Sequence, residues 1–588
     1  MGIQGLTGFI DQCGTLLKDG HFRNSKVVID GSNIYHFLYF NSSVDQQHGG
    51  DYEDNVCKFF KALRDCGIEP YVIIDGGSDH NDKKFETLRK RAESKIDTAN
   101  KLSRGLCRDR IIPTLARQVF KQVMSSLRVP FAQAIFEADQ EIASLAQRWN
   151  CPVLSNDNDF YIFDIQAGFL PMSHFQWQNS SVQNDIPCKR YTTTSFCRHF
   201  NINSQLLPVF AAIAGNDYVN LNKMGFSFRW KDNSPMGPNR KPRFVFFNKL
   251  LKWLASFQEK QDALENVPLI RHGENDMDTA LQALFQGIET YQIQPECLER
   301  FFNDGEAPDP GLLPVHLSVL PDWTLLPLTK GTLPPYMIYI LQRRPVIQGV
   351  QVEDHSLPSG NITSRHIRQV FYGMLLGEGS EVEEYDREDT NLTSSMVTAI
   401  LPSAAQQLQL AMLNQAPHSV RLEVFLETVG VSQSTLNGVP PHLRLAMAVT
   451  YYWQRRAHPR PDLPLLQALL LGLVYAEFCR QRKSQRGFIE GPVLERMRGL
   501  IQRHALSPDL GVAHVFSQWN RCMRDGLDLN QLLCLPLPEP QCAWLYKGTL
   551  LHQLVGQLRR GVTPDSLLME DPSSVQLYRA MLEAILNS

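Results

Sequence analysis

The sequence lacks most of the features that mark a secreted, membrane or metal-finger protein. Its 12 cysteines form no Cys-x-x-Cys pair and no metal-ligand spacing with histidine, which indicates reduced thiols in a cytosolic or nuclear protein. The amino terminus, MGIQGLTGFIDQC, has neither the basic start nor the long apolar core of a signal peptide. The most apolar stretch, Leu463 to Ala476, is too short to span a bilayer. We therefore expect a soluble intracellular protein without a membrane partner.

The chain also lacks a strong net charge, an internal repeat and any Walker, HExxH or GxGxxG signature. A formal net charge of −3 gives no global indication of nucleic-acid binding, so a basic surface must be local. With 43% hydrophobic and 20% charged residues, the composition is that of an ordinary globular protein. At 588 residues the chain is too long for one core, and we expect two to four domains.

Acidic residues follow four short apolar runs that are typical of buried strands. Lys26 to Asp30 is followed by Gly-Ser-Asn, and Tyr71 to Asp75 by Gly-Gly. The runs at residues 131–136 and 152–154 lead to the pairs Glu137 with Asp139 and Asp157 with Asp159. Alternating strands and helices predict a parallel sheet, whose sites lie outside the carboxyl ends of the strands. Any one of these acids could simply cap a helix or solvate a turn, but their convergence on one edge is hard to explain by capping.

A seventh acid, Asp217, closes an apolar helix at Gly215-Asn-Asp. Clustered carboxylates need a counter-charge, and the usual one is a hard divalent cation such as Mg²⁺ or Mn²⁺. Two such ions roughly 4 Å apart would suit phosphodiester hydrolysis without a protein nucleophile. Phosphatase or nucleotidase action on a small molecule is the alternative chemistry.

A basic insertion separates Asp75 from Glu137. Residues 81–130 hold 13 Lys or Arg against 5 Asp or Glu, a local balance of +8. A solvated surface helix is the plain interpretation. Beside a carboxylate cluster, however, such a segment can supply the cations that a phosphodiester polymer needs. A small phosphate would need far fewer cations, so the insertion favours a polymer substrate.

The second half of the chain is predicted to be α-helical. Helical apolar spacing occurs in the ranges 364–376, 395–413, 443–454, 465–479, 494–504 and 550–558. Pro/Gly-rich stretches at Lys231–Arg243 and Asn303–Tyr336 indicate boundaries. An acidic stretch, Glu378–Asp389, is expected to be a solvated or disordered loop. We hypothesise that it competes with the substrate for the basic insertion.

Six motifs in order, MGIQGL, VVIDGSN, VIIDGG, EADQEIASLA, LSNDNDF and GNDYV, resemble the flap endonuclease/XPG superfamily of PIN-like nucleases. The whole-chain layout resembles the asteroid branch of that superfamily. The resemblance implies an α/β PIN-like (FEN/XPG-type) nuclease domain with a parallel central sheet and a basic arch insertion, followed by a mostly α-helical C-terminal region. The expected ranges are 1–230 for the nuclease domain (arch about 80–128), 231–310 for a linker and helical extension, and 311–588 for the helical region.

The resemblance also implies roles for individual residues. The first metal ion would be held by Asp30, Asp75, Glu137 and Asp139, and the second by Asp157, Asp159 and Asp217. The substrate-binding candidates are Gly2 near the scissile phosphate, His36 as a base-stacking ring, and Lys83, Lys84, Arg89 and Arg91 in the arch. A satisfied helix-face histidine is an equal interpretation of His36. The cofactors would be two Mg²⁺ or Mn²⁺ ions, and the partner DNA.

One departure from the family pattern bears on the substrate. Duplex-gripping members follow the last Asp with a GIGPK-like glycine turn, which the residues after Asp217 lack. We therefore predict a structure-specific endonuclease acting on single-stranded DNA, overhangs or flaps, in DNA repair. A catalytically silent nucleic-acid-binding scaffold is the alternative function. The helical region is a candidate protein-binding platform, and the expected substrate implies a nuclear location, or otherwise a cytoplasmic one.

Overall fold

The computed structural model divides the chain into two compact units that interleave along the sequence. The first, which we call the sheet unit, comprises Met1–Ile34, Lys58–Thr87 and Arg128–Asp309. The second, the helical unit, comprises Tyr35–Cys57, Leu88–Leu127 and Pro310–Ser588. The structure describes residues 2–41, 50–77, 84–179, 184–228, 241–272, 276–293, 298–313, 315–484, 491–502, 509–545 and 547–586.

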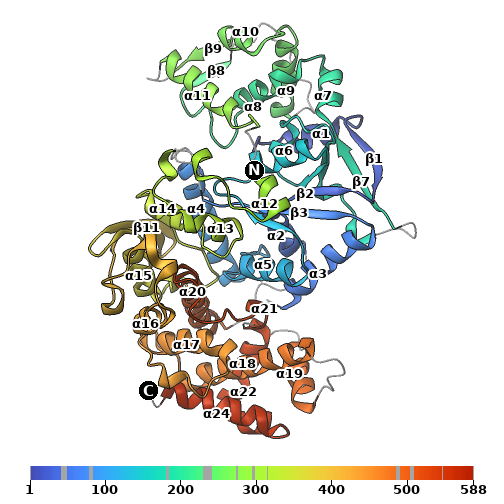
Figure 1. Ribbon diagram of the computed structural model, residues 1–588. Coiled ribbons are helices and arrows are strands. Elements are labelled where there is room, and N and C mark those ends of the chain that lie inside the picture. The colour runs from blue at the N-terminus through green and yellow to red at the C-terminus, as the bar shows by residue number, and fades with distance from the viewer. Residues whose placement is uncertain are drawn as a thin grey trace. The chain divides into compact units, whose positions relative to one another are not determined.

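A seven-stranded sheet in the order β1-β7-β6-β5-β2-β3-β4 forms the centre of the sheet unit (Figure 1). The strands are β1 (Leu17–Phe22), β2 (Lys26–Asp30), β3 (Glu69–Ile74), β4 (Phe131–Gln133), β5 (Val153–Ser155), β6 (Phe169–Pro171) and β7 (Ile186–Tyr191). Five neighbouring strands, from β6 to β4, run parallel, and β7 and β1 add an antiparallel edge. Val27, Val28 and Ile29 of β2 are fully buried, as a parallel strand covered on both faces requires. The predicted parallel sheet is confirmed, while β1, β6 and β7 were not predicted.

The sheet unit runs on to Asp309, past the end predicted at residue 230. Its helices include α1 (Leu6–Gln12), α6 (Asp139–Arg148), α7 (Thr193–Phe200), α8 (Leu207–Ala214), α9 (Pro242–Leu254), α10 (Lys260–Glu265), α11 (Met277–Glu289) and α12 (Leu298–Asp304). A separate pair of antiparallel strands consists of β8 (Phe226–Phe228) and β9 (Leu269–Arg271). Phe247 and Leu250 of α9 and Leu284 and Ile288 of α11 belong to the same buried core as the sheet. The range 231–310 is therefore an integral part of this unit, because its helices supply apolar side chains to one continuous core. Residues 229–240, within the predicted boundary loop, lie outside the described residues.

Three helices pass from one unit to the other: α2 (Gly31–Phe40), α3 (Gly50–Asp65) and α4 (Phe85–Ser103). The helical unit also contains α5 (Ala116–Ser126), α13 (Asp322–Thr329), α14 (Met337–Leu341), α15 (Arg365–Leu376), α16 (His418–Val429), α17 (Arg444–Arg456), α18 (Leu463–Ser484), α19 (Pro492–Gln502), α20 (Leu510–Leu532), α21 (Cys542–Leu545), α22 (Gly548–Arg559), α23 (Pro564–Leu568) and α24 (Pro572–Leu586). The prediction of a mostly helical C-terminal region is confirmed.

The prediction of a solvated acidic loop at 378–389 is wrong. The stretch forms β11 (Glu381–Glu388), which lies between β10 (Val346–Ile347) and β12 (Asn391–Thr398) in a three-stranded sheet. Every second side chain, at Val382, Glu384 and Asp386, is buried, which is the period of a strand with one covered face. The predicted helix at 395–413 is also wrong, because its first residues pair with β11 as β12. The acidic stretch is thus part of the packed structure rather than a free competitor for DNA.

Helix α18 is longer than the apolar run seen in the sequence. Within the described part of the chain, it is the one helix that is long and apolar enough by length and composition to cross a membrane. Its leucines Leu466, Leu469, Leu470, Leu471 and Leu473 are fully buried, and it packs against α22 and α24. We interpret α18 as the core helix of the helical unit, because 67% of its apolar window is already covered by protein.

Candidate active site

Asp30 is the last residue of β2, and Asp75 directly follows β3, the paired parallel strand, where the register sets Asp30 opposite Ile73. Asp30 accepts a 2.9 Å hydrogen bond from the Asn33 amide at one oxygen and a 2.7 Å bond from the Ser155 hydroxyl at the other. The Asp75 amide donates to the Ser32 hydroxyl over 2.8 Å. Two hydrogen bonds therefore hold the Asp30 carboxylate, while Ser32 holds the backbone of Asp75.

The pair Glu137 and Asp139 follows β4 and begins α6. The Ala138 amide, between them, donates to Asp75 Oδ1 over 3.0 Å, so this loop is tied to the end of β3. The glycine after Asp75 is required by the same close approach, because a Cβ atom at Gly76 would overlap the Ala134 carbonyl oxygen. The strand–Asp–Gly pattern of the sequence thus reflects two backbones in contact.

Asp157 and Asp159 flank Asn158 in the turn after β5 that leads into the 3₁₀ helix η2 (Asn158–Tyr161). Asn158 makes two hydrogen bonds to the backbone of Ile3, at 2.7 and 2.9 Å, and so fixes the amino-terminal segment against this turn. Gly2 lies beside it with φ +54°, and a Cβ atom there would come within 2.6 Å of Asp159 Oδ1. The structure therefore places Gly2 beside Asp159, and its role near the scissile phosphate stays a prediction.

Asp217 lies in the loop after α8, where Asn216 organises the backbone. The Asn216 side-chain oxygen accepts hydrogen bonds from the amides of Tyr218 and Val219, at 3.0 and 2.9 Å. The Thr87 hydroxyl donates to the Asp217 carbonyl over 3.4 Å. A short Asn-centred turn thus presents the seventh carboxylate.

The seven carboxylates form one electrostatically connected set within the sheet unit. Burial, followed by the charge of Asp75, raises the pKa of Asp30 to about 7. Burial, followed by the charge of Asp157, raises the pKa of Asp159 to about 7 and that of Asp139 well above its usual range. Burial also raises the pKa of Glu137, and the charges of Asp75 and Asp217 add to that rise. The structure therefore brings together all seven acids that the sequence singled out.

Lys84 is the arch residue that the sheet unit places at this cluster. Its ammonium donates to Glu137 Oε2 over 2.6 Å and lies 5.7 Å from the centre of the Tyr218 ring. Burial lowers the pKa of Lys84, but the charges of Glu137 and Tyr218 outweigh burial and raise it overall. Lys84 is therefore a fixed positive charge within the carboxylate cluster.

The other arch and stacking candidates belong to the helical unit or lie outside the described residues. Lys83 lies outside them. Arg89 is 40% exposed and lies 3.8 Å from Glu93 one helical turn away, and Arg91 is half-buried on the same helix. The His36 ring lies 4.2 Å from that of Tyr35 and is parallel to Phe40, at 6.1 Å. Phe40 is 44% exposed, so the His36 ring belongs to an aromatic group that reaches solvent.

Sequence reasoning missed Tyr291 and Ser155, whose hydroxyls donate to carboxylates of the cluster. The Tyr291 hydroxyl, from just beyond α11, donates to Asp159 Oδ1 over 2.7 Å. No local pattern marks this tyrosine, because its partner lies 132 residues away in the sequence. Ser155, in contrast, stood inside the LSNDNDF motif and could have been read as a strand-end hydrogen-bond donor.

The donor chemistry of this cluster fits a hard divalent cation. All seven candidate ligands are carboxylates, which Mg²⁺ and Mn²⁺ prefer, and burial followed by their mutual repulsion raises several of their pKa values. Among the residues that the structure describes, no group of three or more His, Cys, Asp or Glu side chains has the spacing of a metal site. The chemistry of the cluster thus indicates the kind of ion, while its spacing defines no coordination shell.

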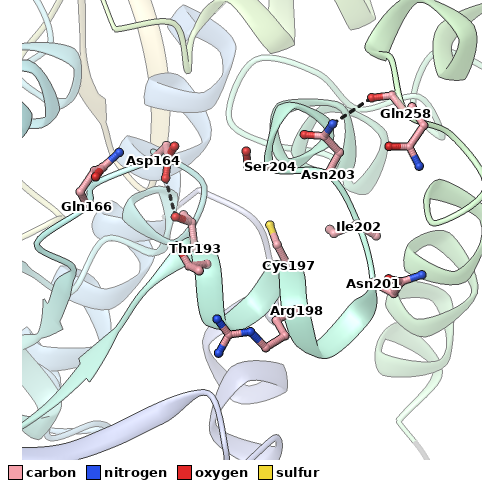
Figure 2. Close-up of a pocket in the computed structure, with 11 residues that line it drawn as sticks. Asp164, Gln166, Thr193, Cys197, Arg198, Asn201, Ile202, Asn203, Ser204 and Gln258 are labelled. Carbon is pink, nitrogen blue, oxygen red and sulfur yellow. Dashed lines mark hydrogen bonds between the residues drawn. The ribbon is translucent and has the colours of Figure 1, made fainter.

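A separate polar pocket of about 560 Å³ lies elsewhere in the sheet unit and contains none of the seven acids (Figure 2). Its walls come chiefly from α7 and from residues 201–204, with Asp164 accepting a 2.5 Å hydrogen bond from the Thr193 hydroxyl. Burial, with a contribution from Asp164, raises the pKa of the lining thiol Cys197 to about 12. The thiol is therefore un-ionised at neutral pH, and the pocket offers no activated nucleophile.

The parallel sheet and its acidic edge define a PIN-like nuclease domain of the flap endonuclease/XPG type. The XPG N-terminal domain model matches residues 1–98, and the Asteroid N-terminal domain model matches residues 494–588. The zebrafish (Danio rerio) protein named single-strand DNA endonuclease ASTE1 is 42% identical, over 100% of this chain and 86% of its own length. The human protein of the same name is 37% identical, over 99% and 90%. The chain therefore belongs to the ASTE1 family of asteroid-type XPG nucleases.

Two further comparisons cover less of the chain. The Drosophila melanogaster protein asteroid is 29% identical over 37% of this chain and 32% of its own length. Among solved structures, the catalytic core of Rad2 in complex with DNA substrate is 16% identical, with a TM-score of 0.30, over 50% of this chain and 88% of that one. At this TM-score the structural likeness adds nothing to the family assignment.

Proposed function

We propose that the protein is a divalent-metal-dependent endonuclease that cleaves single-stranded DNA, including overhangs and flaps. The observation that carries the proposal is the set of seven mutually repelling carboxylates, gathered from four strand ends and one helix end. A scaffold that only bound nucleic acid would gain nothing from burying these like charges together, and the burial would cost stability. The cluster therefore favours catalysis over the silent scaffold.

Two ions are the expected complement. Asp30, Asp75, Glu137 and Asp139 would hold one, and Asp157, Asp159 and Asp217 the other. Bound Mg²⁺ or Mn²⁺ polarises a scissile phosphate and generates the attacking water-derived nucleophile. The chain itself supplies hydrogen bonds to the Asp30 carboxylate from Asn33 and Ser155 and to the Asp75 carboxylate from the Ala138 amide. Lys84 keeps a positive charge beside Glu137.

Single-stranded DNA is the proposed substrate for two reasons. The relatives that match nearly the whole chain carry the name single-strand DNA endonuclease. The sequence after Asp217 also lacks the glycine turn with which duplex-gripping members hold DNA. The 13 basic residues at 81–130 would offset the phosphodiester charge. A role in DNA repair, a nuclear location and a protein partner for the helical unit complete the proposal.

The test is cleavage of end-labelled oligonucleotides by the full chain with Mg²⁺, with Mn²⁺ and with EDTA. Single-stranded, 5′-flap, 3′-flap and blunt duplex substrates are compared for the wild type and for Asp75→Ala and Asp157→Ala. We expect metal-dependent cleavage of the single-stranded and flap substrates and a loss of about 10³-fold or more in either variant. Asp19→Ala is the matched control, since this carboxylate is 87% exposed on β1 of the same unit. Cleavage of blunt duplex as fast as single-stranded DNA would refute the proposed substrate. Cleavage by both variants at the wild-type rate would refute the proposed site.

A further inference from the structure

One short segment of the sheet unit touches three of the carboxylate-bearing segments. It consists of residues 287–291, the carboxyl-terminal end of α11 and the two residues after it, and we call it the 287–291 segment. It lies within the range that the sequence had indicated as a linker and helical extension. Its contacts are those expected of a structural support behind a metal site.

The most direct contact joins Tyr291 to Asp159. The tyrosine hydroxyl donates to Asp159 Oδ1 over 2.7 Å, and the two residues are only 7% and 9% exposed. The Phe163 ring packs edge-on against the Tyr291 ring, with centroids 5.4 Å apart. Because the ring is packed and its hydroxyl is engaged, the Asp159 carboxylate is held in one orientation through one of its two oxygens.

A second contact reaches the residue before Asp217. The Asn216 side-chain amide donates to the Gly287 carbonyl over 3.3 Å and to the Tyr291 hydroxyl over 3.5 Å. The same asparagine organises the turn that presents Asp217. The 287–291 segment is therefore linked to a second carboxylate through Asn216.

A third contact reaches the residue after Asp139. The Gln140 side-chain amide donates to the carbonyls of Glu289 and Thr290, at 3.3 and 3.1 Å. Gln140 is the second residue of α6, whose first residue is Asp139. The start of this helix is therefore held against the same backbone.

The segment can approach this closely because residue 287 is glycine. A Cβ atom there would lie 2.6 Å from Val219 Cγ2 and 3.3 Å from Ala212 Cβ. The backbone of α11 at Gly287 thus packs directly on the Ala212 and Val219 side chains of α8 and of the loop after it. This approach places Tyr291 within reach of Asp159.

We propose that the 287–291 segment is a positioning element of the metal site, and that Tyr291 is a positioning residue that fixes the Asp159 carboxylate for a divalent cation. The inference rests on the proposed metal-dependent function. On this inference, residues beyond 230 contribute to the metal site. The positions of Asp139, Asp159 and Asp217 then all depend on contacts with the 287–291 segment.

The test measures cation binding directly, on the full chain without DNA. Mn²⁺ binding is followed by electron paramagnetic resonance or titration calorimetry for the wild type, Tyr291→Phe and the control Tyr191→Phe. The control removes an equally buried hydroxyl of the same unit, which donates over 3.0 Å to the Tyr161 carbonyl instead of a carboxylate. We expect Tyr291→Phe to weaken Mn²⁺ binding about 10-fold, as is usual when a residue that hydrogen-bonds a metal ligand is replaced, and Tyr191→Phe to leave it unchanged.

A second variant keeps the test decisive if Tyr291→Phe fails to fold. Gln140→Ala removes only the side-chain bonds to the Glu289 and Thr290 carbonyls and is expected to weaken Mn²⁺ binding a few-fold. The Mg²⁺ concentration for half-maximal cleavage should rise in both variants, while cleavage at saturating Mg²⁺ largely recovers. Wild-type Mn²⁺ affinity in both folded variants would overturn the inference and leave the proposed function standing. Absence of Mn²⁺ binding by the wild type would instead overturn the proposed function.

Discussion

Replacing Arg368 by Met should destabilise the helical unit by about 3–5 kcal/mol. Arg368 lies on α15 and is 1% exposed, and its guanidinium donates to both oxygens of Glu384 on β11, at 2.7 and 2.8 Å. It also donates to Asp525 on α20 over 3.0 Å. Asp525 keeps a partner in Arg521 when Arg368 is removed. Glu384 is fully buried and keeps the Tyr372 hydroxyl, at 2.6 Å, which cannot neutralise its charge.

The magnitude follows from that imbalance. Leaving one buried carboxylate without its cation costs about 3–5 kcal/mol, a large share of the 5–15 kcal/mol that stabilises a typical domain. Replacing Glu384 as well, in Arg368→Met with Glu384→Leu, removes the stranded charge. The double variant should therefore recover most of the loss, to within about 1.5 kcal/mol of the wild type.

The assay is urea unfolding combined with hydrogen exchange of peptides from α15 and β11. Arg579→Met is the control, because the Arg579–Asp565 pair has a similar 2.9 Å separation but is 60% and 56% exposed. Such an exposed pair contributes about 0–1 kcal/mol. A loss below about 1 kcal/mol in Arg368→Met, or no recovery in the double variant, would refute the reasoning. Deleting residues 378–389 should likewise unfold this region rather than raise cleavage, because it removes β11.

Three further outcomes are expected. Gly2→Ala should lower cleavage about 10-fold or more in the standard oligonucleotide assay, because its Cβ atom would displace Asp159 Oδ1; wild-type activity would contradict the placement. Lys84→Met should lower cleavage by the folded variant about 10²-fold, since it removes the cation hydrogen-bonded to Glu137; a loss confined to stability would argue for a structural role. Burial lowers the pKa of Lys121 from 10.5 to about 7, so the unfolded chain binds the extra proton between these values and stability rises with pH across this window. Lys121→Met should reduce that slope by up to about 1.4 kcal/mol per pH unit, measured by urea unfolding at pH 7 to 10, and an unchanged slope would contradict it.

The carboxylates could be predicted from sequence because each depends on local rules. An apolar run that ends in Asp and Gly predicts both the strand and its chemistry, and parallel strands end at a common edge. Asp30 and Asp75 lie at the same edge because β2 and β3 are paired parallel strands, as the α/β alternation implies. The grouping of these acids at one edge of the sheet can thus be predicted from the order of the strands along the chain.

Tyr291 and β11 could not be predicted in the same way. Tyr291 reaches Asp159 only through the packing of α11 on α8, and no spacing in the sequence encodes that contact. In the stretch 381–388 every second side chain from Val382 to Asp386 is buried, but its many acids favoured a solvated interpretation. The buried Glu384 of β11 stays ionised because Arg368 and Tyr372 of α15 and Arg521 of α20 together lower its pKa against the effect of burial. Tertiary partners override local charge at this position.

The interleaving of the two units has a consequence for synthesis on the ribosome. Helix α5 is made long before the residues that accept its side-chain hydrogen bonds. Gln122 donates to the Pro540 carbonyl over 2.9 Å, and Lys121 donates to the Gly331 carbonyl over 2.6 Å. The sheet unit, by contrast, has all its segments once Asp309 is made. A premature stop just after Asp309 would therefore leave every segment of the sheet unit present, while Lys121 and Gln122 of α5 would lack these two acceptors. Early termination at this point should thus yield a chain that carries all seven candidate carboxylates but not the carbonyls that α5 needs.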